Sequence, residues 1–316
     1  MKIEKPQRIK TPRRAVHGVL LLDKPLGLSS NDALQKAKWL LRAEKAGHTG
    51  TLDPLATGLL PLCFGAGTKF SQISLDADKA YEATLLLGVT TSTGDAEGQV
   101  LERRDVAVTL AQITAACAQY TGPIEQIPPM HSALKHQGRA LYEYARAGIE
   151  IERKPRSIMI HSIDLVDWQD DRLTLAVRCS KGTYIRTLAE DIGRALGCGA
   201  SLCALRRTGS GPLLVEQAIS LDALAAMTEL EREALLRPPD SLLADWPELR
   251  LDQGEAARFL TGLRRRLDPA THADALHVRV YGPEPQEFLG SAHITAGELI
   301  ADRLLSTQEV QSLLSA

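Results

Sequence analysis

The chain of 316 residues has few aromatic side chains and no long hydrophobic run. Phe, Tyr and Trp make up only 4% of it, so an aromatic residue in a loop is more informative than usual. The longest apolar candidate, residues 59–64, has the length of a buried strand and falls short of the ~18–20 residues that a membrane span needs. No apolar stretch typical of a secretory signal follows the basic N-terminal residues. We therefore expect a cytoplasmic protein with no membrane contact.

Cysteine motifs and an excess of one charge are also missing. The five cysteines include no Cys-x-x-Cys pair and no histidines cluster beside them, which argues against a zinc site and favours reduced, idle thiols. The net charge of −2 implies no nucleic-acid partner for the chain as a whole. Lysine and arginine are nevertheless concentrated in residues 1–14, 135–156 and 178–207. Such patches fit an anionic macromolecule held by one face, and they also fit chance.

Turn residues, helix caps and hydrophobic periodicity predict strands and helices without a βαβ rhythm, which favours an α+β fold. The expected strands are residues 18–23, 59–64, 79–87, 157–168, 172–179, 276–280 and 288–293. The expected helices are residues 32–41, 110–120 (capped by Thr109), 141–147 and 187–196. Residues 46–57 and 122–130, rich in Gly or Pro, are expected to be irregular. Prolines near residue 245 mark a boundary before a small, mostly β unit.

Residues 47–58 contain three glycines, three threonines, one His, one Asp and one Pro between a predicted helix and a predicted strand. One interpretation is an ordinary turn in which Asp53 hydrogen-bonds the backbone. The density of small residues favours another, because it lets a large ligand approach the backbone beside an ionised carboxylate that acts as nucleophile or base. Residues 65–69 and 209–211 lack the residue order of a phosphate-binding or dinucleotide-binding loop.

The run Gly-His-Thr-Gly-Thr-Leu-Asp-Pro at residues 47–54 resembles the catalytic motif of the TruB family of pseudouridine synthases, the bacterial tRNA pseudouridine-55 synthases. Other segments resemble further motifs of that family, in its order and spacing, at residues 23–30, 79–88, 128–135, 138–148, 181–188 and 205–208. Together they cover residues 18 to about 212.

The resemblance implies a pseudouridine synthase fold, with a mixed, mainly antiparallel central sheet flanked by helices and loops. It implies three parts: a basic tail at 1–17, a catalytic domain at 18–245 with an RNA-clasping insertion at about 128–157, and a β-rich PUA-like RNA-binding domain at 246–316.

The implied activity is the isomerisation of uridine to pseudouridine at position 55 in the T loop of tRNA, after the base is flipped out. The reaction involves no redox change, so no cofactor and no metal are expected. The T-arm stem-loop is the expected partner of a monomer that needs no other protein.

The resemblance makes Asp53 the nucleophile or essential carboxylate, and it places Arg186 beside Asp53, where a guanidinium would hold the carboxylate ionised. A helix-cap role for Arg186 is the alternative, which a buried strand end at residues 182–185 would disfavour. Tyr81 would stack on the flipped uracil and help proton transfer; otherwise it is a half-buried strand aromatic.

The resemblance also implies contacts beyond these three residues. The other implied nucleoside contacts are His48, Tyr184 and Leu205, and the implied phosphate contacts are Lys24, Lys135, Arg206 and Arg207. His131 stands where relatives often have Tyr or Phe, which puts only a local contact in doubt.

Two other functions are left open. One is a pseudouridine synthase that acts on another RNA or needs a guide RNA, although the terminal extensions of such proteins are not evident. The other is an RNA-binding module or tRNA-folding chaperone without turnover, against which the joint presence of Asp53, Tyr81 and Arg186 argues.

Overall fold

The computed structural model describes residues 12–268 and 272–315, so residues 1–11 of the predicted basic tail lie outside the described residues. The strands are β1 (Gly18–Lys24), β2 (Ala46–His48), β3 (Ala56–Phe64), β4 (Lys79–Leu87), β5 (Val89–Thr91), β6 (Val100–Arg103), β7 (Gly122–Gln126), β8 (Lys135–His136), β9 (Arg139–Ala140), β10 (Arg156–Gln169), β11 (Arg172–Cys179), β12 (Ala200–Ser210), β13 (Leu213–Leu214), β14 (Ile219–Ser220), β15 (Glu248–Arg250), β16 (Arg265–Arg266), β17 (Ala275–Tyr281), β18 (Phe288–Thr295) and β19 (Glu298–Leu304). The helices are α1 (Ser30–Leu40), α2 (Ser71–Asp76), α3 (Leu110–Gln119), α4 (Leu141–Arg146), α5 (Ile185–Ala195), α6 (Leu221–Ala226), α7 (Glu229–Ala234), α8 (Gln253–Phe259) and α9 (Thr307–Leu314), with short 3-10 turns at Gly65–Lys69, Val215–Gln217 and Pro239–Leu243.

A ten-stranded sheet organises the larger part of the chain, in the order β14-β1-β3-β12-β4-β11-β10-β7 with β2 and β13 as short additions. The pairs β1–β14 and β3–β12 are parallel, and the other pairs are antiparallel. The mixed, mainly antiparallel α+β architecture predicted from the sequence is therefore confirmed.

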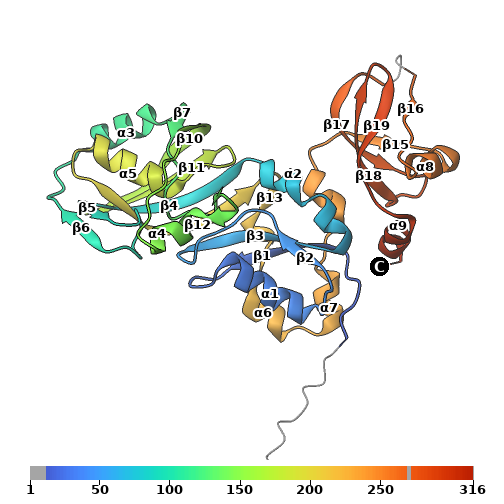
Figure 1. Ribbon diagram of the computed structural model, residues 1–316, viewed down its shortest axis with the longest axis horizontal. Coiled ribbons are helices and arrows are strands. Elements are labelled where there is room, and N and C mark those ends of the chain that lie inside the picture. Colours follow the sequence, from blue (N-terminus) through green and yellow to red (C-terminus); the bar gives the residue numbers. More distant parts are fainter. Residues whose placement is uncertain (1–11, 269–271, 316) are drawn as a thin grey trace, which may run out of the picture.

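Two hydrophobic cores lie along this sheet. One packs α3 and α5 against β4, β10, β11 and β12, and the other packs α1 and α6 against β1 and β3. Figure 1 shows these two lobes side by side, joined by the long strand β4. Tyr81 and Leu205 are partly buried and pack against both cores. The junction between the lobes is therefore where a strand side chain can be held firmly and still reach a ligand.

A five-stranded sheet, in the order β15-β17-β18-β19-β16, forms the C-terminal part, seen in orange and red in Figure 1. A third core joins it to the large sheet, because buried side chains of β1 and β3 pack with those of the C-terminal sheet, and the rings of Phe70 and Phe288 lie 5.2 Å apart in this contact. Lys69 donates hydrogen bonds to the carbonyl of Leu304 and to the carboxylate of Glu309. Apolar and polar contacts thus bind the C-terminal sheet to the segment that follows β3.

Several elements match the prediction closely. Strand β4 has both predicted ends, and Thr109 caps α3 in a reciprocal capping box with Gln112. Among the described residues, no helix is long and apolar enough to cross a membrane.

Three local predictions are wrong. Ala46–His48 is a strand and not a loop, because it pairs with the end of β3. Gly122–Gln126 is also a strand, and Pro123 is tolerated in it because β7 lies at the edge of the sheet, where a missing N–H donor is acceptable. Residues 182–185 do not end a strand, since β11 stops at Cys179 and α5 begins at Ile185. Helices α8 and α9 were not predicted.

We expect Phe70→Ala to lower the free energy of unfolding by about 3–5 kcal/mol, because it removes a fully buried ring between the two sheets. Urea unfolding followed by circular dichroism measures this. Leu276→Ala, at a side chain that is 85% exposed, is the matched control and should change stability by less than about 0.5 kcal/mol. Equal losses in the two variants would contradict the role given to Phe70.

Candidate active site

The loop that carries Asp53 connects β2 to β3, and its backbone is clamped from two sides. Ser30, at the start of α1, is buried; its hydroxyl donates to the carbonyl of Leu52 (3.0 Å) and accepts from the Leu52 N–H (2.7 Å). The N–H of Gly27 donates to the carbonyl of Pro54 at 2.8 Å. The side chain of Asp53 nevertheless stays 44% exposed. A fixed backbone therefore presents an accessible carboxylate.

Arg186 lies in the first turn of α5 with only 8% of its side chain exposed. Its Nη2 lies 3.0 Å from Oδ2 of Asp53, and its Nη1 lies 3.1 Å from Oδ2 of Asp95. The same guanidinium donates to the carbonyls of Thr93 (3.2 Å) and His131 (2.6 Å). One buried cation thus joins the Asp53 loop, the turn after β5 and the segment before β8. Arg186 does lie at the start of a helix, as the alternative helix-cap role supposed. Its side chain, however, points into the protein and not to the surface.

Asp95 is the residue that the sequence analysis missed. Its side chain is 4% exposed, and its second oxygen accepts from the Thr93 hydroxyl at 2.6 Å and from the Glu97 N–H at 3.1 Å. Two carboxylates share one guanidinium, so the group Asp53–Arg186–Asp95 keeps one negative charge. The only signal for Asp95 in the sequence is the run Thr93-Gly94-Asp95, which is typical of a turn and does not by itself indicate a site residue.

Tyr81 is half-buried on β4, directly opposite Arg207 on β12. Burial raises the pKa of the Tyr81 phenol, while the charge of Arg207 opposes that rise. His48, on β2, has a buried Nδ1 without a hydrogen-bond partner among the described residues, and burial followed by the charge of Arg207 lowers its pKa. His48 is therefore a neutral imidazole at physiological pH, suited to fill space or accept a contact.

Tyr184 and Leu205 border the same region from other elements. Tyr184 occupies the N-cap position of α5 without a side-chain capping bond, and its backbone N–H and carbonyl are both hydrogen-bonded to the side chain of Gln126. Burial raises the pKa of its phenol, and Asp53 is among the charges that act on it. Leu205 lies on β12 between Ala56 and Ala83. Tyr184 thus lies within the electrostatic range of Asp53, and Leu205 lies beside Ala56, where β3 begins after the Asp53 loop.

Two of the four expected phosphate contacts are corrected by their burial. Lys24 is fully buried, and its ammonium donates to the carbonyls of Pro25 and Leu28. Burial lowers its pKa to about 8, against the charge of Asp53, which raises it. Arg207 is 1% exposed and donates to backbone carbonyls inside the protein. A side chain closed off in this way cannot reach a phosphate.

The other two residues lie at the surface. Lys135 is exposed on β8. Arg206 makes a two-fold hydrogen bond with Asp23, at 3.0 and 2.8 Å, which raises the arginine pKa further. A phosphate would have to compete with that carboxylate for Arg206.

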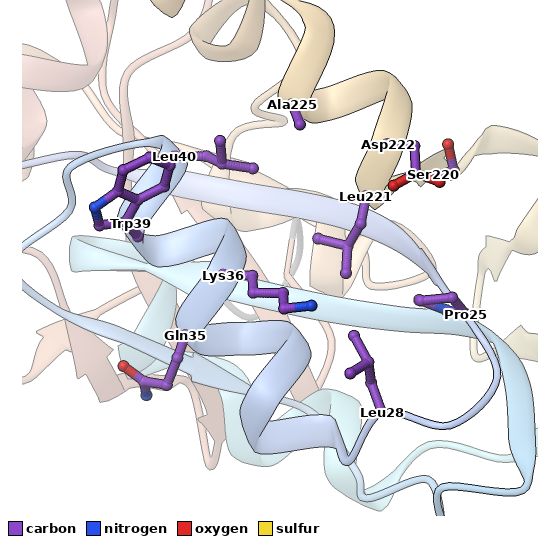
Figure 2. Close-up of a pocket in the computed structure, with 10 residues that line it drawn as sticks. All are labelled: Pro25, Leu28, Gln35, Lys36, Trp39, Leu40, Ser220, Leu221, Asp222 and Ala225. Atoms are coloured by element: carbon purple, nitrogen blue, oxygen red, sulfur yellow. The ribbon is translucent and has the colours of Figure 1, made fainter.

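An apolar groove of about 560 Å³ lies on the outer face of α1, against α6. Figure 2 shows the indole of Trp39 at one end of it and Pro25 and Leu28 at the other. None of the described residues placed in the candidate site lines this groove. Within the described part of the chain, no cluster of three or more His, Cys, Asp or Glu side chains is arranged to hold a metal ion.

Three family models match the chain in succession. They are described as TruB family pseudouridylate synthase (N terminal domain) over residues 38–185, tRNA pseudouridylate synthase B C-terminal domain over residues 186–244, and Pseudouridine synthase II TruB, C-terminal, over residues 247–305. Two relatives named tRNA pseudouridine synthase B, from Verminephrobacter eiseniae and Burkholderia mallei, are 60% and 57% identical to the chain. The alignments cover 98% and 95% of this chain and 95% and 97% of the relatives.

Solved structures share the fold at lower identity. A crystal structure of a Cbf5-Nop10-Gar1 complex matches with a TM-score of 0.67 and 26% identity, over 93% of this chain and 80% of that chain. The archaeal box H/ACA sRNP Nop10-Cbf5 complex matches with a TM-score of 0.66 and 24% identity, over 94% and 82%.

We expect Asp95→Asn to lower the free energy of unfolding by about 2 kcal/mol, because a hydrogen bond to a charged group is worth roughly that much. The amide oxygen of asparagine can still accept from Thr93 and from the backbone of Glu97, so the substitution isolates the lost charge beside Arg186. Denaturant unfolding measures the difference. The exposed Asp171→Asn serves as the control, and the same stability in both variants would rule out a stabilising role for the Asp95 charge.

Proposed function

This chain belongs to the TruB family of pseudouridylate synthases and isomerises uridine to pseudouridine in tRNA, and we propose that it does so at position 55 of the T loop with Asp53 as the essential carboxylate. The target base is flipped out of the RNA, and the chain acts as a monomer on the T-arm, in the cytoplasm where tRNA is found. The C1′–N1 bond breaks, the uracil turns, and a C5–C1′ bond forms. N1 takes up a proton and C5 loses one, so no oxidant or reductant enters.

The observation that carries this proposal is the contact between Arg186 and Asp53. The chemistry needs a carboxylate that is held in place, and the guanidinium of Arg186 lies 3.0 Å from Oδ2 of Asp53 and fixes its orientation. Arg186 is buried and held by Asp95, so it is in place before the substrate arrives. Asp53 itself is exposed enough to meet the ribose of a flipped nucleotide.

Tyr81 supports the flipped base. Extruding a stacked uracil costs a few kcal/mol, and stacking on an aromatic ring returns about 1–3 kcal/mol of that. Tyr81 is held between two cores, and Asp53 is among the charges acting on its phenol, so the ring can receive the base near the carboxylate. The phenol then takes part in moving the proton that C5 gives up.

The remaining binding energy comes from contacts to the RNA backbone. The insertion at about 128–157 supports a role as an RNA clasp, because it exposes Lys135 and places Arg139 and Arg146 over the rings of Tyr144 and Tyr142. We assign the C-terminal sheet from residue 246 onward, as a PUA-like domain, to tRNA beyond the target loop. Its β-rich architecture supports this assignment.

We expect Asp53→Asn to abolish pseudouridine formation while RNA affinity stays within about tenfold, because an amide keeps the shape and loses the charge. Tritium release from tRNA labelled at C5 of uracil measures turnover, with the wild-type protein assayed beside the variant. Release by the wild type alone establishes a carboxylate-dependent isomerase. Normal release by Asp53→Asn would overturn the role of Asp53, and tight binding without release by either protein would point to a chaperone.

Tyr81→Leu should reduce the single-turnover rate far more than tRNA binding, since leucine fills part of the space and offers neither a flat ring nor a phenol. Rapid-quench assays with enzyme in excess give the rate, and filter binding gives the affinity. Tyr142→Leu, at a partly exposed ring of the insertion, is the contrasting variant and should mainly weaken binding. An affinity loss as large as the rate loss in Tyr81→Leu would contradict a role in the chemical step.

A further inference from the structure

Arg207 is a buried cation that the mechanism described so far does not use. Its Nε donates to the carbonyl of Leu59 at 2.7 Å, and its Nη2 donates to the carbonyl of Gly50 at 3.3 Å. Within residues 12–268 and 272–315, no carboxylate forms an ion pair with it. Burying a guanidinium without an anion costs free energy, so another interaction at this place must offset that cost.

The group that faces Arg207 is the phenol of Tyr81. The two residues are directly opposed on the antiparallel strands β12 and β4, where facing side chains lie within contact distance. Among the described residues, Tyr81 is the ionisable group that supports the charged state of Arg207 against the cost of burial, which lowers the arginine pKa. The hydrogen bond to Gly50 ties the same guanidinium to the loop of Asp53. Arg207 therefore lies opposite Tyr81 and is also hydrogen-bonded to the loop that carries Asp53.

We propose that Arg207 is a positioning residue that acts through Tyr81, fixing the phenol beside the Asp53 loop and stabilising negative charge on the phenol oxygen. The inference rests on the proposed function, in which Tyr81 takes part in proton transfer. Tyr81 first loses its proton to solvent. After the C5–C1′ bond has formed, the phenolate takes the surplus proton from C5, and the phenol is restored as the uracil ring regains its double bond.

The surroundings of the phenol show why the charge of Arg207 matters for this role. Burial raises its pKa, and Cys179 from β11 and Asp53 from its loop add to that rise. Among the described residues, Arg207 from β12 is the group that opposes them, by its positive charge. Removing the guanidinium while leaving the other three influences should therefore move the phenol titration to higher pH.

The test uses full-length protein with tyrosine isotopically labelled at Cζ, so that NMR follows each phenol, with Tyr81→Phe identifying the Tyr81 signal. We expect Arg207→Met to titrate Tyr81 at higher pH than the wild type. The single-turnover rate at neutral pH should fall at least about tenfold, which is the effect of one pKa unit, and recover in part as the pH rises. Arg178→Met, on the adjacent strand β11 and exposed, is the matched control and should leave the phenol titration unchanged.

Two further variants keep the test decisive. If Arg207→Met does not fold, Arg207→Gln decides by the same titration, because a neutral amide can still donate to a backbone carbonyl but carries no positive charge. In a Tyr81→Phe background the loss of rate from either Arg207 variant should largely vanish, since the partner is gone.

An unchanged Tyr81 titration in a folded Arg207 variant, or a rate loss that persists in the Tyr81→Phe background, overturns the inference. Failure of the proposed function would give a different result, because the wild-type protein would then release no tritium from the labelled tRNA. The titration is read on the protein without RNA, so it stands whichever reaction the site performs.

Discussion

A single buried guanidinium determines the geometry of the candidate site. Arg186 pairs with two carboxylates and donates to two backbone carbonyls, so each of its two terminal nitrogens has one carboxylate and one carbonyl as partners. Such a group cannot rotate to follow one partner without abandoning another. The Asp53 loop, the turn at Asp95 and the entry to the insertion are therefore held in one relative arrangement before any RNA is bound.

The sheet supplies the second part of this arrangement. Because β4 and β12 run beside each other where the two cores meet, their side chains are supported by packing from both lobes. Tyr81, Leu205 and Arg207 all belong to that pair of strands. Rigid strands place a ring and a cation more precisely than a loop could, while the loop carries the one group that must remain accessible.

Much of this could be predicted from the sequence, and the exceptions share a physical cause. Local patterns sufficed for β4 and for the cap at Thr109, because alternation and capping act over a few residues. Motif resemblance indicated Asp53 and Arg186, which the structure brings together.

The sequence could not predict which polar residues the tertiary structure buries or pairs. Lys24 and Arg207 are basic residues expected at the surface, yet both are buried. Arg207 donates to the carbonyl of Leu59 from a distant segment, whereas Lys24 donates to carbonyls of the turn that follows it. Asp95 gains its importance only from a helix about ninety residues away, and an edge position in the sheet decides that Pro123 can lie in a strand.

The two ends of the large sheet also bear on how separate molecules behave. One end is β14, which is only two residues long, and the other is β7, where Pro123 removes a hydrogen-bond donor. Neither edge offers a strand of another molecule a full row of hydrogen-bond partners, so pairing between the large sheets of separate molecules is disfavoured.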